Sequence, residues 1–281
     1  MLIVCAHYIL WEPFSLIINK YLKMTSLNIL IKCKLMSFDK ILKPQHNYDL
    51  IRIGRDNDGG YLIEKKSLEN TQSLISLGIS DDWSFEEDFL KKNKNTSIKC
   101  FDNVLDKKFL LKKIIIQFVF LFYNRNFRIL KKLISIYFSF LRMKKKIQFI
   151  KKKISYNDLK KILSQERNNI FLKIDIEGGE YRILDDLLLN QTKIIGLVIE
   201  FHDCDLHREK ILKFLRSFNL TLVHIHGNNF AERDLNNDIT VLELTFSKNP
   251  IQISDINTLP NKLDMPNNFE KNEVILNFKK Q

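Results

Sequence analysis

The stretch from Phe171 to His202 constrains the fold of this chain more than any other. It begins with a short apolar run, Phe171–Ile176, and continues through a Glu-Gly-Gly-Glu turn into a segment with helical periodicity. A second apolar run, Ile194–Ile199, closes it. Continuous apolar runs indicate strands that are buried on both faces, as in a parallel sheet covered by helices. The stretch therefore predicts a strand–helix–strand unit of an α/β fold.

Acidic and histidine side chains gather where these two strands are expected to end. Asp175 and Glu177 lie at the end of the first run, and Glu200 and His202 follow the second. In open α/β sheets, ligands bind beyond the carboxyl ends of the strands. A carboxylate at the end of a buried strand is also unfavourable without a partner. We therefore interpret these side chains as parts of a functional site.

The same stretch resembles the FkbM-like methyltransferases, whose hallmark is an apolar strand ending in DIEG-x-E. Two further parts of the chain resemble that family: GRDNDGGYLI, LISLGISDDWSFEEDF and IKCFD in the first half, and LVHIHGNN with ITVLELTF in the second. The resemblance covers residues 51–246. It implies a doubly wound, mostly parallel Rossmann-like methyltransferase sheet with an antiparallel last strand. It also implies S-adenosylmethionine as the cofactor.

The loop after the strand run Leu74–Leu77 favours the same cofactor. It contains one glycine, whereas dinucleotide-binding loops carry G-x-G-x-x-G, so a diphosphate cofactor is disfavoured. Asp102 ends the next strand run and is expected to accept hydrogen bonds from the ribose hydroxyls. An ordinary loop and a capping aspartate are the alternatives. The expected cofactor-binding residues are Gly78, Ser80, Asp81, Ser84, Asp102 and Asp175.

Three side chains are candidates for catalysis. Asp175 is expected to hold the cofactor ammonium, orient the acceptor hydroxyl or act as a general base. His202 and His226 are the other candidate bases, because histidine titrates near neutral pH. A structural histidine bonded to the backbone is the alternative for each. A metal site built from Asp175, His202 and His226 has no supporting motif, so we expect no bound metal.

The positive charge of the chain is concentrated in residues 107–153, which contain 15 Lys or Arg and no Asp or Glu. Of the 45 basic residues, 30 remain elsewhere, against all 33 acidic residues. The segment is also rich in Phe, Ile, Leu and Tyr, which predicts a basic helical insertion able to contact an anionic membrane surface. Solvated helices packed on the core are the alternative. No nucleic-acid-binding module is recognisable, so no nucleic-acid partner is expected.

The sequence predicts one methyltransferase-like domain over residues 37–249, between an N-terminal extension, 1–36, and a C-terminal tail, 250–281. The extension starts apolar but lacks a basic region and fits neither a signal peptide nor a membrane span. Met24 and Met36 are alternative starts to Met1. The four cysteines form no C-x-x-C pair, which is consistent with a reducing compartment. We expect a cytoplasmic protein, peripheral at the inner face of the membrane.

The activity implied by the resemblance is O-methylation of a sugar or another small hydroxyl acceptor in surface-glycan biosynthesis. Two alternatives stay open. A nucleotide-sugar glycosyltransferase would need a D-x-D motif, for which Asp203–Asp205 is the candidate, although this triplet is expected to open a helix. A non-catalytic, membrane-associated protein of methyltransferase shape would tolerate a degenerate cofactor loop. Binding of S-adenosylmethionine distinguishes the three.

Overall fold

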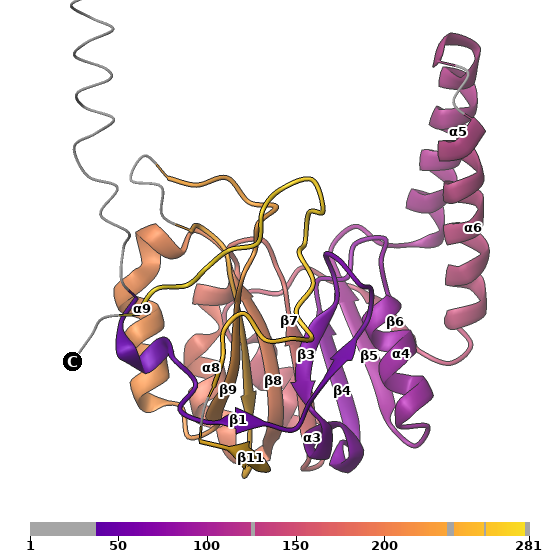
Figure 1. Cartoon of the computed structure of the whole chain (residues 1–281). Helices are drawn as coiled ribbons and strands as arrows, with labels where there is room; N and C mark the ends of the chain where they lie inside the picture. Colours follow the sequence, from indigo (N-terminus) through magenta and orange to yellow (C-terminus); the bar gives the residue numbers. More distant parts are fainter. Residues whose placement is uncertain (1–37, 125–126, 235–238, 256, 279–281) are drawn as a thin grey trace, which may run out of the picture.

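A seven-stranded sheet forms the centre of the protein in the computed structural model, which describes residues 38–124, 127–234, 239–255 and 257–278 (Figure 1). The predicted extension, residues 1–36, lies outside the described residues. Across the sheet the strands are β6 (Gln148–Lys151), β5 (Ser97–Asp102), β4 (Ser73–Leu77), β7 (Ile170–Ile174), β8 (Ile194–Phe201), β10 (Leu242–Ser247) and β9 (Thr221–Gly227).

The strand directions confirm the predicted fold class. The strand β4 pairs in parallel with β5 and β7, β5 with β6, and β7 with β8. Only β10 is antiparallel, to β8 on one side and β9 on the other. Because β4, β5 and β7 are parallel, their carboxyl ends lie at one edge of the sheet, and the strand order reverses between β4 and β7.

Helices cover both faces of this sheet, as its continuous apolar strands require. One core contains Leu163, Leu187 and Phe214 with the sheet residues Leu172 and Leu197. The other contains Phe89 and Phe140 with Phe171 and Val198 from the opposite face of the same strands. The helices are α3 (Lys65–Asn70), α4 (Ser84–Lys92), α5 (Lys107–Asn124), α6 (Phe127–Met143), α7 (Asp158–Ser164), α8 (Leu184–Asn190) and α9 (Cys204–Ser217), with short 3₁₀ turns η1 (Lys40–Leu42), η2 (Glu180–Arg182) and η3 (Gln191–Lys193).

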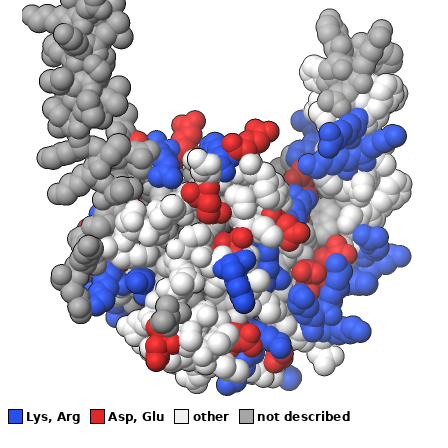
Figure 2. All heavy atoms as spheres, in the orientation of Figure 1, with Lys and Arg blue, Asp and Glu red and all other residues white. Residues whose placement is uncertain are grey.

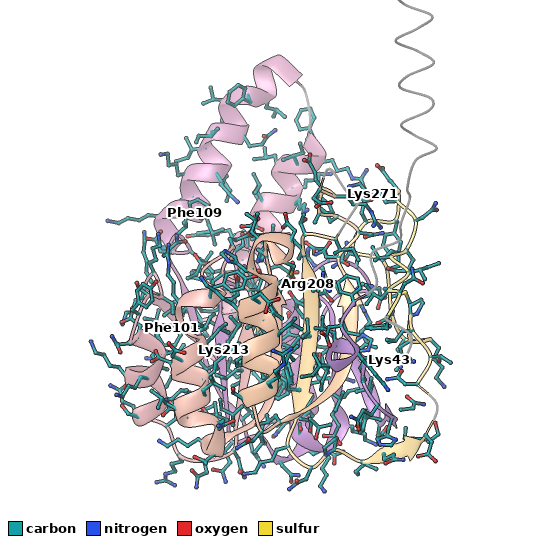
Figure 3. All side chains as sticks on the ribbon, turned by 90° about the vertical axis from the view of Figure 1, so that its left-hand side faces the viewer. Lys43, Phe101, Phe109, Arg208, Lys213 and Lys271 are labelled. Carbon is teal, nitrogen blue, oxygen red and sulfur yellow. The ribbon has the colours of Figure 1, made fainter. Side chains whose placement is uncertain are left out.

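The helices α5 and α6 form a hairpin that rises past the end of the sheet in two perpendicular views (Figures 1 and 3). The expectation of a helical insertion over 107–153 is wrong at its end, because Gln148–Lys151 is the edge strand β6. This strand has no buried apolar run that would reveal it in the sequence. Within the described residues, no helix combines the length and apolarity that crossing a membrane requires.

Residues near both ends of the described chain pack against the sheet or against each other. The hairpin of β2 (Leu50–Ile53) and β3 (Tyr61–Glu64) carries the Asp-Asn-Asp-Gly-Gly turn, and β3 lies against β8, β9 and β10. The strand β1 (Asn47–Tyr48) pairs with β11 (Gln252–Ser254). Further along, Asn267 Nδ2 donates to Glu243 Oε1 over 2.7 Å. The segment expected to be a C-terminal tail thus completes contacts of the sheet.

Candidate active site

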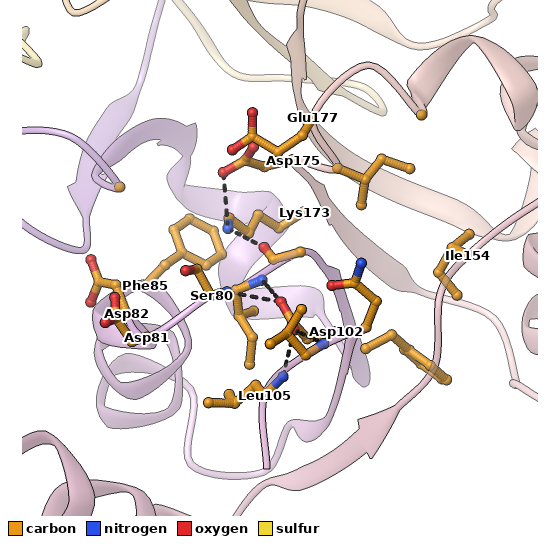
Figure 4. Close-up of a pocket in the computed structure, with 18 of the residues that line it drawn as sticks. Ser80, Asp81, Asp82, Phe85, Asp102, Leu105, Ile154, Lys173, Asp175 and Glu177 are labelled. Atoms are coloured by element: carbon orange, nitrogen blue, oxygen red, sulfur yellow. Dashed lines mark hydrogen bonds and ion pairs between the residues drawn. The ribbon is translucent and has the colours of Figure 1, made fainter. Parts of the chain in front are cut away.

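A pocket of about 780 Å³ opens at the carboxyl ends of β4, β5 and β7 (Figure 4). Its volume is within the range of small-molecule sites, about 300–1,000 Å³. Five of the six predicted cofactor-binding positions line it, and one of them, Asp175, is also a predicted catalytic residue: Gly78, Ser80, Asp81, Asp102 and Asp175. The structure brings these positions together because parallel strands end at the same edge of the sheet.

Gly78 is required by the close approach of two strand ends. Its φ is +75°, and a Cβ at this position would lie 1.6 Å from the main-chain oxygen of Asp175. The neighbouring backbone is tied by the amide of Asp175, which donates to Leu77 O over 2.9 Å. Gly78, which the sequence analysis interprets as a cofactor contact, is therefore also required by the packing of the two strand ends.

Asp102 fastens the two loops that line this part of the pocket. Its Oδ1 accepts from the amides of Val104 and Leu105 at 2.7 and 2.8 Å. Its Oδ2 accepts from the amides of Ser80 and Ile79 at 3.0 and 3.3 Å. These four bonds use about all four acceptor positions of the carboxylate, so a ribose hydroxyl would bind Asp102 by displacing one of the loop amides.

The other polar positions of the cofactor loop separate into two groups. Ser80, at φ +46°, and Asp81 line the pocket, and Asp81 Oδ2 lies 2.9 Å from Lys113 Nζ of α5. Ser84 begins α4 and is not among the lining residues, whereas Asp82 is. Asp82 Oδ1 accepts from the amide of Ser84, the first residue of α4, over 3.0 Å. The sequence pattern did not distinguish the position that lines the pocket, Asp82, from the one that does not, Ser84.

Asp175 lies between the pocket and a buried polar cluster. Its Oδ2 is 3.7 Å from Lys173 Nζ and accepts from the Tyr61 hydroxyl over 3.4 Å. Lys173 is only 5% exposed, and its Nζ also donates to Gly78 O over 2.8 Å. Burial would lower the pKa of Lys173, but Asp175, Glu86 and Glu200 raise it, so the side chain stays charged. Lys173 and Tyr61 are functional candidates that the sequence reasoning missed.

One signal in the sequence points to Lys173. It precedes Asp175 by two positions in the strand run, so strand alternation places both side chains on the same face. A lysine within an otherwise apolar buried strand needs a partner of opposite charge. Tyr61 comes from the separate β2–β3 hairpin and has no comparable signal.

His202 is held among four carboxylates. Its Nδ1 lies 3.2 Å from Glu180 Oε1, and its Nε2 lies 3.3 Å from Glu177 Oε2, 3.7 Å from Glu200 Oε1 and 4.0 Å from Asp175 Oδ1. Burial alone would lower the pKa of His202, but the hydrogen bond and charge of Glu180, with Glu200 and Asp175, raise it to about 9. The imidazole is therefore protonated at neutral pH and is a poor base, and it does not line the pocket.

His226 lies in a different buried network. Its Nδ1 is 3.2 Å from Glu243 Oε2 on β10, and its Nε2 is 3.1 Å from Glu273 Oε1 near the C-terminus. Burial alone would lower the pKa of His226, but these two carboxylates raise it to about 11. The structure does not bring His226 to the pocket lining. A charged, ion-paired histidine in this position is a structural group and a poor candidate for the base.

The stability of the protein should therefore depend on the charge of His226. Because its pKa rises from 6.5 to about 11 on folding, its contribution is fully present below pH 6.5 and is lost as the pH rises through about 11. We expect the free energy of unfolding of His226→Gln to lie below that of the parent at neutral pH, with the difference shrinking towards pH 11. Urea denaturation across this range measures it. Two pH profiles that run parallel would contradict the ion pairs.

The comparisons with known proteins identify the class of this protein. The family model of the methyltransferase FkbM domain matches residues 142–227, which include β7, β8 and the DIEGGE block. The match confirms the resemblance seen in the sequence, and the protein is a methyltransferase. The matched residues do not include the Gly78 loop or Asp102. No curated protein sequence matches the chain significantly.

Several solved structures show a general likeness. An rRNA methylase from Streptococcus thermophilus is 11% identical, with a TM-score of 0.36 and coverage of 65% of this chain and 90% of that one. Aeropyrum pernix fibrillarin with natively bound S-adenosyl-L-methionine is 9% identical, with a TM-score of 0.37 and coverage of 64% and 68%. These identities and scores are low, and the strand order described above defines the fold independently of them.

Proposed function

We propose that this methyltransferase methylates a hydroxyl oxygen of a saccharide or another small acceptor. The observation that carries the proposal is the pocket that joins the Gly78 loop and Asp102 to Asp175. Hydroxyl-rich acceptors suit a lining with many polar side chains, which here include Asn57, Asp58, Arg182 and Asn267. When bound, S-adenosylmethionine supplies a methyl group attached to a positively charged sulfur.

The chain offers side chains that fit the parts of this cofactor. Asp102 and the loop amides beside it provide polar groups at one end of the pocket, next to the apolar side chains of Val104, Leu105 and Ile154. Such a combination suits a ribose joined to an aromatic base. Asp175 provides negative charge, and Lys173 fixes its position. The residues present are therefore compatible with the cofactor.

Asp175 is the proposed residue for orienting the acceptor hydroxyl and for receiving its proton. Among the three catalytic candidates it alone lines the pocket, whereas His202 and His226 are held protonated by carboxylates. The adjacent turn through Glu177 and Gly178 has positive φ at both residues, +52° and +85°, and returns the chain close to the strand end. This turn supports a fixed position for Asp175 at the pocket.

Asp102→Ala should weaken the binding of S-adenosylmethionine. Hydrogen bonds that involve a charged group are worth about 1.5–3 kcal/mol, so we expect the dissociation constant to rise roughly 10- to 150-fold. Isothermal calorimetry measures it. Asp106→Ala is the matched control, because Asp106 is nearby and pairs with Lys151 but does not line the pocket. An unchanged dissociation constant for Asp102→Ala would rule out Asp102 as a cofactor ligand.

We further propose that the α5–α6 hairpin holds the protein at an anionic membrane surface. Basic side chains gather on this side of the molecule (Figure 2). Large apolar side chains are exposed along both helices: Ile115, Ile116, Phe118, Val119, Phe120, Phe127, Ile129, Ile134 and Phe138. This combination of apolar and basic groups is typical of helices that lie in the membrane interface. Phe109, at the base of α5, lines the pocket, so the hairpin would keep the pocket near a lipid-linked acceptor.

Reversing two charges of the hairpin should weaken membrane binding. Each lysine near an anionic surface contributes about 1 kcal/mol, so Lys131→Glu with Lys132→Glu should reduce vesicle binding by at least about tenfold. Added salt should also weaken binding, because charges are screened beyond about 8 Å at physiological ionic strength. Co-sedimentation with anionic and neutral vesicles measures both effects.

The matched control for this experiment is Lys65→Glu with Lys66→Glu, a pair of exposed lysines on α3, away from the hairpin. The membrane proposal fails if the parent protein stays in the supernatant with anionic vesicles at low salt. It also fails if the control pair reduces binding as much as the hairpin pair does.

A further inference from the structure

A cluster of metal-ligating side chains lies beside the pocket, at the adjacent ends of β7 and β8. Asp175, Glu200 and His202 each offer one ligand atom, and these three atoms all lie within 4.8 Å of one another. The three residues come from two neighbouring parallel strands, whose register brings Ile174 opposite Ile199. The ligands are therefore positioned by the sheet itself and not by a flexible loop.

His202 has the orientation expected of a metal ligand. Glu180 Oε1 lies 3.2 Å from Nδ1 and also accepts from the amide of Ile176 over 3.0 Å, so the carboxylate is fixed. A ring nitrogen that donates to a carboxylate leaves the other nitrogen available, and this outer partner is characteristic of histidines that bind metals. The available Nε2 faces the oxygens of Asp175 and Glu200 at 4.0 and 3.7 Å.

The cluster also brings several buried carboxylates close together around His202. Glu200 is 6% exposed, and Glu180 is completely buried. The second oxygen of Glu180, Oε2, is buried without a hydrogen-bond partner. Buried carboxylates are unfavourable unless they are paired with positive charge. Lys173 contacts Asp175 on the pocket side, and a metal ion would take the place of the proton on His202 Nε2 among the remaining carboxylates.

We propose that Asp175, Glu200 and His202 bind a divalent cation of the Mg²⁺ or Mn²⁺ type. One imidazole and two carboxylates form a mixed nitrogen and oxygen set that suits such hard or borderline metals. Metal–ligand bonds of about 2.0–2.2 Å place ligand atoms roughly 3–4.4 Å apart, so the present separations need only a small contraction. The sequence shows no metal motif because the ligands come from two separate strands. Asp175 precedes Glu200 by 25 residues.

Asp175 connects this cation to the pocket, because the same carboxylate lines it. If the proposed methyl transfer to a hydroxyl is correct, on which this role rests, the cation would bind the acceptor oxygen and lower the pKa of its hydroxyl. Proton removal would then need no histidine as the base, because His202 would be a ligand of the cation. The cation site itself stands on the geometry of the three ligands and does not depend on that reaction.

The test is a titration of the purified full-length chain with Mn²⁺, followed by the electron paramagnetic resonance signal of the free ion. We expect one bound Mn²⁺ per chain, with competition by Mg²⁺. Glu200→Gln and His202→Ala should each weaken binding by at least the roughly 10–100-fold that loss of an outer-shell partner causes. Glu209→Gln, which removes an exposed carboxylate of α9, is the matched control and should bind as the parent does.

Circular dichroism and calorimetry with S-adenosylmethionine accompany each variant. Retained structure and cofactor affinity in Glu200→Gln and His202→Ala show that any loss of Mn²⁺ is local. The proposal is overturned if the parent binds no Mn²⁺ at millimolar concentration, or if folded ligand variants bind it as tightly as the control does. Binding of Mn²⁺ without methyl transfer to any hydroxyl acceptor would sink the proposed function and leave the cation site standing.

Discussion

Asp175→Asn is expected to lower the rate of methyl transfer by roughly 10²–10⁴-fold, the range associated with loss of a general base. The substitution keeps the shape of the side chain but removes the negative charge that faces Lys173, 3.7 Å away, and His202, 4.0 Å away. It also removes the one catalytic candidate that lines the pocket. Because the amide is isosteric, the fold should persist, and circular dichroism should show equal folded fractions.

The measurement is the turnover of S-adenosylmethionine with a hydroxyl acceptor, compared at equal folded fraction. Asp185→Asn, an exposed position in α8, is the matched control and should retain the activity of the parent. If Asp175→Asn is as active as this control, Asp175 neither receives the proton nor orients the acceptor. A fall in affinity for S-adenosylmethionine with little change in turnover would restrict Asp175 to holding the cofactor.

Gly78→Ala is expected to destabilise the protein by about 3 kcal/mol or more, in the range produced by overpacking and backbone strain. The added Cβ would lie 1.6 Å from the main-chain oxygen of Asp175, so β4 and β7 would have to separate. Gly178→Ala is the matched control, since φ is +85° there as well, but the nearest atom to an added Cβ is 3.7 Å away. Left-handed strain alone costs about 1–2 kcal/mol.

Urea denaturation of both variants separates the clash from the strain. The difference between the two losses in free energy of unfolding reports the close contact of the strand ends. If Gly78→Ala is folded and loses no more stability than Gly178→Ala, the contact between Gly78 and Asp175 is absent in solution. The prediction concerns stability alone and holds whether or not a cofactor binds.

The strands of the sheet and the position of the pocket could be predicted because both depend on local patterns. Apolar runs mark β7 and β8, and their carboxyl ends fix where Asp175, Glu200 and His202 lie. The edge strand β6 escaped prediction because an edge strand is not buried on both faces and needs no apolar run. The strand β6 is held by backbone hydrogen bonds to β5, and such backbone pairing leaves no pattern in the side chains.

The electrostatic state of the histidines could not be predicted because their partners are distant in the sequence. The sequence predicted His226 as a base from its residue type and from its position near the end of a strand run. Glu273, which helps to hold it protonated, comes from 47 residues further along the chain. His202 was placed correctly at a strand end, but the carboxylate at its Nδ1 comes from the turn η2, which carries no separate signal.

The order of strands in the sheet also has a consequence for the growing polypeptide on the ribosome. The strand β10 is made after β9 but lies between β8 and β9, so β9 has no partner in the sheet until β10 has left the exit tunnel. The other five strands of the sheet, β4 to β8, pair with one another without β9 or β10. Synthesis therefore passes through a stage in which the pocket edge exists while β8 presents an open flank. At this stage another nascent chain can add to that flank, and quick arrival of β10 protects the protein from aggregation.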